Sequence, residues 1–161
     1  MPIVLFRVDE RLIHGQVVVG WGERLHAEQL VVIDDTIVAS PWEQELYCLG
    51  VPAEMEACFV STEEARRLLP GWRADRARTI VLVRALETVR ALAASGGLRE
   101  QPVNLGGIHH AAGRERVLPY LFLGAGEHEL LRELSAGGVQ LSAQDLPGSR
   151  EVPVTELLAH A

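Results

Sequence analysis

The sequence predicts an α/β protein built on an open, mainly parallel sheet of seven strands with helices on both faces. Short apolar runs alternate along the chain with helix-like segments, which is the order of a parallel sheet with crossover helices. The apolar runs are mostly continuous, as in strands that are covered on both sides. With 161 residues, 48% of them hydrophobic, we expect one domain over residues 1–161 with a core of its own.

Seven apolar runs of strand length carry this prediction. They are Ile3–Val8, Leu30–Asp34, Glu56–Val60, Thr79–Val83, Pro102–Gly107, Pro119–Gly124 and Val139–Ala143. In an open parallel sheet, ligands bind beyond the carboxyl ends of the strands, near the point where the strand order reverses. The residues that follow the first and fifth runs are therefore the first place to look for a site.

The helices are predicted from hydrophobic spacing and end signals. Over residues 15–26, apolar side chains recur on one face, at Val17, Val18, Trp21 and Leu25. Two helices have capping boxes, Ser40 with Glu43 and Ser61 with Glu64. The first of these is expected to begin at Pro41 and to close on Gly50. Further helices are predicted over residues 86–95, 127–138 and 154–160.

Composition excludes several classes of function. The formal net charge of −7 argues against binding to nucleic acid. All 15 basic residues are Arg, which excludes a Schiff-base or Walker A lysine. Cys48 and Cys58 lack metal or redox spacing, and we expect both to be buried in a protein of a reducing cytosol. Neither a signal peptide nor a membrane-spanning run is expected, so we predict a cytoplasmic protein.

The loop after the first strand is the richest stretch of the sequence. His14 lies at the end of the loop, and Gly15 is expected to open the helix. The free backbone N–H groups at that helix start, of Gly15, Gln16 and Val17, would point outward together with the positive end of the helix dipole. These groups would form an anion site beside the imidazole of His14.

Charged residues precede His14 in the same loop. Arg11 can form a forked pair with phosphate or carboxylate oxygens. Asp9 or Glu10 can hold a ring nitrogen of His14 or position Arg11. A nucleophilic imidazole beside a phosphate cradle is what phosphoryl transfer requires. Purely structural roles stay open: a core histidine for His14, a surface ion pair for Arg11 and solvated loop charges for the acids.

The loop after the fifth strand and the end of the second strand add candidates. The fifth-strand loop carries Asn104, Gly106, Gly107, His109, His110 and Arg114, and its glycines predict a close backbone approach or a left-handed turn. Asp34 and Asp35 follow the second strand and serve equally well as a helix-cap pair. The remaining histidines, His26, His128 and His160, are expected to be exposed. The glycine pair lacks the dinucleotide fingerprint, and the sequence has no P-loop.

The run Asp9-Glu10-Arg11-Leu12-Ile13-His14-Gly15-Gln16-Val17 resembles, without a mismatch, the motif near the N-terminus of a bacterial protein family. This family is the IIB component of the mannose/fructose/sorbose class of the sugar phosphotransferase system. Weaker similarities follow in the same order as in the family: "VVIDD" at 31–35, "VNLGGIH" at 103–109, "GR" at 113–114 and "LPYLFL" at 118–123. The resemblance covers essentially the whole chain.

The resemblance implies a seven-stranded, mostly parallel sheet with one antiparallel strand. It implies that His14 is the phosphohistidine, modified on Nδ1, with Arg11 as the phosphate-loop arginine and Asp9 as the loop acid. Around these three residues we expect a second layer of the site, formed by residues of the other loops: Asp34, Asn104, Gly106, Gly107, His109 and Arg114.

The partners that the resemblance implies are a phosphorylated IIA protein as donor and the membrane components IIC and IID, which hold the sugar. Through these partners the protein is expected to lie at the inner face of the membrane. No metal and no other cofactor is expected, because the donor is itself a phosphorylated protein. Homo-oligomerisation stays open.

Two alternatives remain at this point. One is a regulatory phosphorelay module of the same fold that takes no part in transport. The other is a metal-dependent hydrolase that uses His14, His109, His110 and Asp34.

Overall fold

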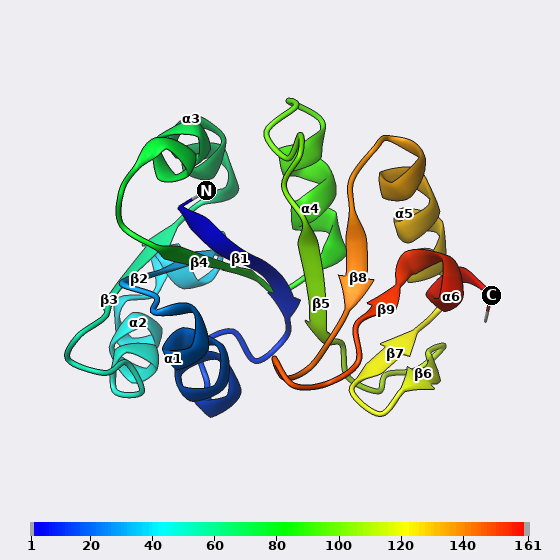
Figure 1. Ribbon diagram of the computed structural model, residues 1–161, viewed down its shortest axis with the longest axis horizontal. Coiled ribbons are helices and arrows are strands. Elements are labelled where there is room, and N and C mark those ends of the chain that lie inside the picture. Colours follow the sequence, from blue (N-terminus) through cyan, green and yellow to red (C-terminus); the bar gives the residue numbers. More distant parts are fainter. Residues whose placement is uncertain (1, 160–161) are drawn as a thin grey trace.

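The computed structural model describes residues 2–159 and contains a seven-stranded sheet in the order β3-β2-β4-β1-β5-β8-β9 (Figure 1). Neighbouring strands are parallel except β8 and β9. The strands of this sheet are β1 (Ile3–Asp9), β2 (Gln29–Ile33), β3 (Glu56–Val60), β4 (Thr79–Val83), β5 (Val103–Gly107), β8 (Leu141–Ala143) and β9 (Val152–Pro153). A separate antiparallel hairpin consists of β6 (Glu115–Leu118) and β7 (Leu121–Leu123).

Helices cover both faces of the sheet and bury two apolar cores. A π-helical segment, a 3-10 turn and six α-helices connect the strands. Their bounds are Gln16–Trp21 (π), α1 (Gly22–Leu25), Ile37–Ala39 (3-10), α2 (Pro41–Cys48), α3 (Thr62–Ala74), α4 (Leu86–Ala93), α5 (Ala125–Ala136) and α6 (Val154–Leu158). The π segment packs on one face, whereas α3, α4, α5 and α6 pack on the other. The predicted fold class and the antiparallel strand are confirmed.

The seventh strand of the sheet is not the one that the sequence predicts. The run Pro119–Gly124 was expected in the main sheet, but its core, β7, pairs with β6 in the hairpin. Only an isolated bridge between Ile108 and Leu121 connects that run to the end of β5. The place at the sheet edge is taken by β9, which has two residues and is too short to produce a periodic pattern.

The helix ends agree with the sequence in one case and differ in another. Ser61 and Glu64 form the predicted capping box, with the Glu64 N–H 3.1 Å from Ser61 Oγ and the Ser61 N–H 3.2 Å from Glu64 Oε1. Ser40 makes no side-chain capping bond, so the capping box predicted there is wrong. The Ser40 N–H donates instead to the Ile37 carbonyl at the end of the preceding 3-10 turn, which sets a different backbone direction.

Three predictions of burial are wrong. Cys48 and Cys58 are exposed, because α2 buries none of its residues and β3 is an edge strand. His128 of α5 is buried. His26 is exposed as expected. His160 lies outside the described residues, as does the end of the helix predicted over 154–160.

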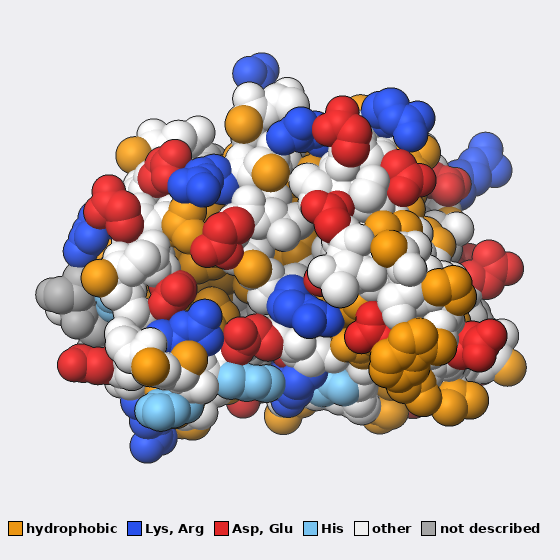
Figure 2. All heavy atoms as spheres, turned by 180° about the vertical axis from the view of Figure 1, so that it is seen from behind, with side chains coloured by type: hydrophobic (Ala, Val, Ile, Leu, Met, Phe, Trp, Pro, Cys, Tyr) orange, Lys and Arg blue, Asp and Glu red, His pale blue; other side chains and the backbone are white. Residues whose placement is uncertain are grey.

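The charges of the chain are dispersed over its surface. In the view from behind, basic and acidic side chains lie interspersed (Figure 2). The pair of Arg90 with Glu133, at 3.5 Å, and that of Arg132 with Glu129, at 3.4 Å, are examples. Within residues 2–159, no helix has both the length and the apolar character needed to cross a membrane.

Candidate functional site

The chemically rich loops meet at the carboxyl ends of β1 and β5, which are adjacent strands. The chain leaves β1 for the helical segment on one face, and it leaves β5 for the hairpin and α5 on the other face. This divergence is the switch point at which open α/β sheets bind ligands. The backbone N–H of Glu10 donates to the Gly107 carbonyl at 2.9 Å and ties the two loops together.

A tight turn shapes the loop that carries His14. The Leu12 N–H donates to the Asp9 carbonyl at 3.0 Å. Leu12 has a φ of 56°, a left-handed conformation that costs a residue with a Cβ about 1 kcal/mol. Its carbonyl oxygen lies 3.0 Å from His14 Nδ1. This contact favours the tautomer in which Nδ1 carries the hydrogen and donates it to Leu12.

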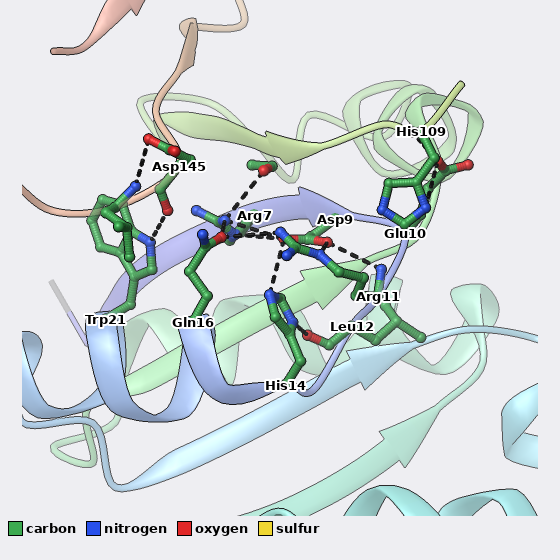
Figure 3. Close-up of polar contacts among 12 residues, drawn as sticks. Arg7, Asp9, Glu10, Arg11, Leu12, His14, Gln16, Trp21, His109 and Asp145 are labelled. Carbon is green, nitrogen blue, oxygen red and sulfur yellow. Dashed lines mark hydrogen bonds and ion pairs between the residues drawn. The ribbon is translucent and has the colours of Figure 1, made fainter. Parts of the chain in front are cut away.

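The imidazole of His14 is half-buried and faces Asp9 (Figure 3). Its Nε2 lies 3.7 Å from Asp9 Oδ2 and has no hydrogen-bond partner among the described residues. Burial lowers the pKa of His14, and the positive charges of Arg11 and Arg7 lower it further. The Leu12 carbonyl and the Asp9 carboxylate act in the opposite direction without reversing the shift. The lowered pKa favours the neutral ring, the form in which an imidazole nitrogen acts as a nucleophile.

Asp9 is completely buried and receives hydrogen bonds from Arg11. Its Oδ1 accepts from the Arg11 N–H and Nε, both at 3.0 Å, and its Oδ2 accepts from Arg11 Nη2 at 3.0 Å. Burial by itself would raise the pKa of Asp9, but these bonds and the charge of Arg7 outweigh it and lower the pKa. The Gln16 side-chain oxygen, 3.0 Å from Arg11 Nη2, holds the same guanidinium from the other side. Asp9 thus positions Arg11, one of the two roles that the sequence left open.

Arg7 is a member of the polar cluster around Asp9 that sequence reasoning missed. Its side chain is completely buried in β1, and its Nε and Nη2 donate to Asp9 Oδ2 at 3.2 and 3.1 Å. The signal was available, because Arg7 is the one charged residue inside the apolar run Ile3–Val8. A charge in such a run needs a buried partner, and Asp9, two positions later on the same face of the strand, is that partner.

The glycines of the second loop give room to the polar side chains of the first. A Cβ added to Gly106 would lie 1.9 Å from Arg7 Cζ, and one added to Gly107 would lie 2.8 Å from Asp9 Oδ1. The close backbone approach predicted for this pair is therefore confirmed. Asn104 accepts from Arg7 Nη1 at 2.9 Å and also belongs to the cluster.

Glu10 joins His109 and Arg114 to the edge of the site. One carboxylate oxygen accepts from the His109 backbone N–H, and the other lies 3.4 Å from Arg114 Nη1. Arg114 also donates to the His109 carbonyl at 2.9 Å and to Glu127 at 3.2 Å. These residues brace the second loop against the first, and Glu10 holds neither His14 nor Arg11 through any of these bonds.

Two groups predicted to belong to the site, the Asp34 carboxylate and the Val17 backbone N–H, are bonded to other partners. Asp34 caps the 3-10 turn by accepting from the Thr36 and Ile37 N–H groups, and its other oxygen lies 3.5 Å from Arg84. The Val17 N–H donates to the His14 carbonyl at 3.0 Å. Of the three backbone N–H groups predicted to bind phosphate, that of Val17 is therefore already hydrogen-bonded. Those of Gly15 and Gln16 have no hydrogen-bond acceptor among the described residues. The space around Gly15 is open, since a Cβ added there would meet no atom within 4 Å.

The geometry gives no support to the metal-centre hypothesis. Within residues 2–159, no three His, Cys, Asp or Glu side chains gather closely enough to hold a metal ion. His109 is engaged with Glu10, and Asp34 is engaged with Arg84.

We expect the imidazole of His14 to titrate with a midpoint below the ordinary value of about 6.5. Because the folded-state pKa is depressed, the stability that this group contributes is complete above about pH 6.5 and is lost as the pH falls through the folded pKa. NMR titration of His14 Cε1–H measures the midpoint, with a peptide of residues 8–18 as the reference. A midpoint equal to that of the peptide would contradict the burial described above.

The chain matches one protein family across residues 3–161, and this family is described as the PTS system sorbose subfamily IIB component. N-acetylgalactosamine-specific phosphotransferase enzyme IIB component 1 of Escherichia coli K12 is 30% identical over 157 residues, which cover 96% of this chain and 97% of that protein. The mannose-specific EIIAB component of the same strain is 24% identical and contains a match to 99% of this chain within 49% of its own length.

Solved structures agree with the sequence comparison. The IIBSor domain of the sorbose permease from Klebsiella pneumoniae superposes with a TM-score of 0.87 at 23% identity, covering 100% of this chain and 98% of that domain. At that identity the likeness shows the fold. The IIB component 1 of the E. coli N-acetylgalactosamine system, at 29% identity, has a TM-score of 0.82 and covers 93% of this chain and 97% of its own. With the family match over nearly its whole length, this chain belongs to the sorbose-subfamily IIB components of the phosphotransferase system.

Proposed function

We propose that this protein is a phosphocarrier that accepts a phosphoryl group on His14 from a phosphohistidine of a IIA partner and passes it to a sugar. The observation that carries the proposal is the position of the His14 imidazole between Asp9 and the Leu12 carbonyl, with Arg11 anchored beside it. Membership of the IIB family supports the transferase role. The mannose-specific EIIAB relative supports a IIA partner, since its name joins the two components.

The transfer conserves atoms and charge without any other reactant. A lone pair of the His14 ring attacks phosphorus, the N–P bond of the donor breaks, and the electron pair of that bond returns to the donor imidazole. Arg11 supplies a fixed cation for the negative charge on the equatorial oxygens. In the second step a sugar hydroxyl oxygen attacks phosphorus, and the His14 ring leaves with its electron pair and can take up the hydroxyl proton.

The ring has to turn before it reacts, because its two nitrogens are both engaged or enclosed. Nδ1 donates to the Leu12 carbonyl, and Nε2 is buried against Asp9. We propose that acceptance on Nδ1, the atom the family resemblance implies, begins with a rotation that releases Leu12. Nδ1 then loses its hydrogen to solvent water while Nε2 takes up a proton from water, which leaves a lone pair on Nδ1 for the attack. The Nε2 hydrogen can be donated to the Asp9 carboxylate, which stabilises the phosphorylated ring.

The test is to incubate the protein with a phosphorylated IIA protein of a sorbose- or mannose-type system. We expect one phosphate per chain that is labile in acid and stable in base, and we expect its transfer to sugar when membranes containing IIC and IID are added. Failure to accept phosphate from any such donor would refute the proposal. Acceptance without formation of sugar phosphate would favour the regulatory module instead.

A further inference from the structure

The buried guanidinium of Arg7 connects the residues around His14 to three strands of the sheet. We infer that Arg7 is a positioning residue for phosphoryl transfer: it fixes Asp9 and Gln16, and through them the orientation of Arg11 and His14. The inference rests on the proposed function of His14. None of the sequence predictions assigned Arg7 a role.

Towards His14, Arg7 is bonded to both groups that hold Arg11. Its Nη2 lies 3.1 Å from Asp9 Oδ2 and 2.7 Å from the Gln16 side-chain oxygen. The same two acceptors receive Arg11 Nη2, each at 3.0 Å. Because the two guanidinium groups share these acceptors, a displacement of Arg7 shifts Asp9 and Gln16 and thereby loosens Arg11 (Figure 3).

On the side away from His14, Arg7 is anchored to Asn104 of β5 and to Gln144, the residue that follows β8. Nη1 donates to Asn104 Oδ1 at 2.9 Å and to the Gln144 carbonyl at 3.1 Å. The Asn104 amide donates to that same carbonyl at 3.1 Å, so the two anchors brace each other. Gly106 leaves the slot for the guanidinium, because any Cβ there would overlap Arg7 Cζ.

Arg7 acts through its neighbours because it cannot reach a phosphoryl group delivered by another protein. Its side chain has no exposed surface, and the Trp21 ring lies 5.6 Å from the guanidinium carbon. Arg7 and Arg11 share the Asp9 carboxylate, which leaves a surplus positive charge beneath the half-buried imidazole. A buried charge is screened little by salt and therefore helps to hold a phosphorylated ring at physiological ionic strength.

The experiment compares Arg7→Gln, which removes the charge, with Arg7→Lys, which retains it, and with Gly106→Ala, which displaces the guanidinium and leaves its charge intact. Arg84→Gln is the matched control, because the Arg84 side chain is exposed and pairs with Asp34 outside the cluster around Arg7. The measurements are the single-turnover rate of phosphoryl acceptance from a phosphorylated IIA protein and the NMR titration midpoint of His14.

We expect Arg7→Gln and Gly106→Ala each to slow acceptance about 100-fold, the order of loss caused by a misplacement of about 1 Å. Arg7→Lys should recover part of the rate, and Arg84→Gln should match the wild type. The midpoint of His14 should rise in Arg7→Gln, because the Arg7 charge disfavours protonation of His14, and should stay near the wild-type value in Arg7→Lys.

A folded Arg7→Gln protein with the wild-type rate and midpoint would overturn the inference. So would a slow variant whose midpoint is unchanged and which Arg7→Lys does not improve, since that result indicates a merely structural role. If Arg7→Gln fails to fold, the rates of Arg7→Lys and of Asn104→Ala, which removes one anchor, decide the question, and wild-type rates in both would refute it. If the wild type itself accepts no phosphate, the proposed function fails, while the titration still tests the link between Arg7 and His14.

Discussion

Replacement of His14 by Ala should abolish phosphoryl acceptance while the protein stays folded. The ring contributes one hydrogen bond, to the Leu12 carbonyl, and its side chain is 18% exposed, so we expect the free energy of unfolding to change by no more than about 1 kcal/mol. His14→Asn tests the chemistry more closely, because its amide can donate to Leu12 from nearly the position of Nδ1 and still offers no nucleophile. Both variants should carry no acid-labile phosphate after incubation with a phosphorylated IIA protein.

The control for this prediction is His110→Ala. His110 is exposed, and its ring packs edge-to-face with that of Phe122, with the two ring centroids 5.6 Å apart. This variant should accept phosphate like the wild type. Phosphate on His14→Ala at the wild-type level would show that another residue is the acceptor.

Replacement of Asp9 by Asn should cause the largest loss of stability. Asp9 and Arg7 are both completely buried, and removal of one partner from a buried ion pair costs about 3–5 kcal/mol because the remaining charge is left uncompensated. For a chain of this size, that corresponds to a fall in melting temperature of roughly 6–20 °C. Phosphoryl acceptance should fall as well, since Arg11 loses its acceptors. Thermal unfolding and the single-turnover rate measure the two effects.

Asp75→Asn is the control for stability, because Asp75 is exposed and its carboxylate accepts from the nearby backbone N–H groups of Arg76 and Ala77. The pH dependence gives a second check. The folded-state pKa of Asp9 is lowered, so its contribution to stability is present above about pH 4 and is lost as the pH falls through the folded pKa. The difference in melting temperature between Asp9→Asn and the wild type should therefore become smaller as the pH falls through that pKa. A wild-type melting temperature for Asp9→Asn at pH 7 would contradict the described role of the carboxylate.

The central strands could be predicted from sequence because burial on both faces produces continuous apolar runs. Val81 and Leu82 of β4, for example, pack into opposite cores, and both are fully buried. The edge of the sheet could not be predicted in this way. The assignment of β9 in place of β7 depends on which strand each segment pairs with: β7 pairs with β6, whereas β9 pairs with β8 and has only two residues, too few to show a pattern.

Helix type and the burial of individual side chains also could not be predicted from the spacing of apolar residues. The apolar spacing of Val17, Val18 and Trp21 locates a helical face, but it cannot distinguish an α-helix from the π-helical turn that is found. Burial of His128 and exposure of Cys58 depend on which neighbours cover a given face, which no local window contains.

The contiguous part of the candidate site could be read from one motif, whereas the rest required the fold. Asp9, Arg11 and His14 lie within six residues of one another, so their proximity follows from the chain itself. Arg7 and Asn104 are 97 positions apart and meet only because β1 and β5 are neighbours. Asn104 was a candidate from the sequence, but its contact with Arg7 depends on the pairing of these strands and could not be predicted.

The central claim is that the phosphoryl group resides on His14, and NMR of the phosphorylated protein tests it most directly. A long-range ¹H–¹⁵N correlation spectrum of uniformly ¹⁵N-labelled protein reports the state of each of the six imidazole rings. We predict that one ring alone shows the phosphohistidine pattern, that it is assigned to His14, and that the substituted atom is Nδ1. A phosphohistidine pattern on His109 or His110, with His14 unchanged, would contradict the account.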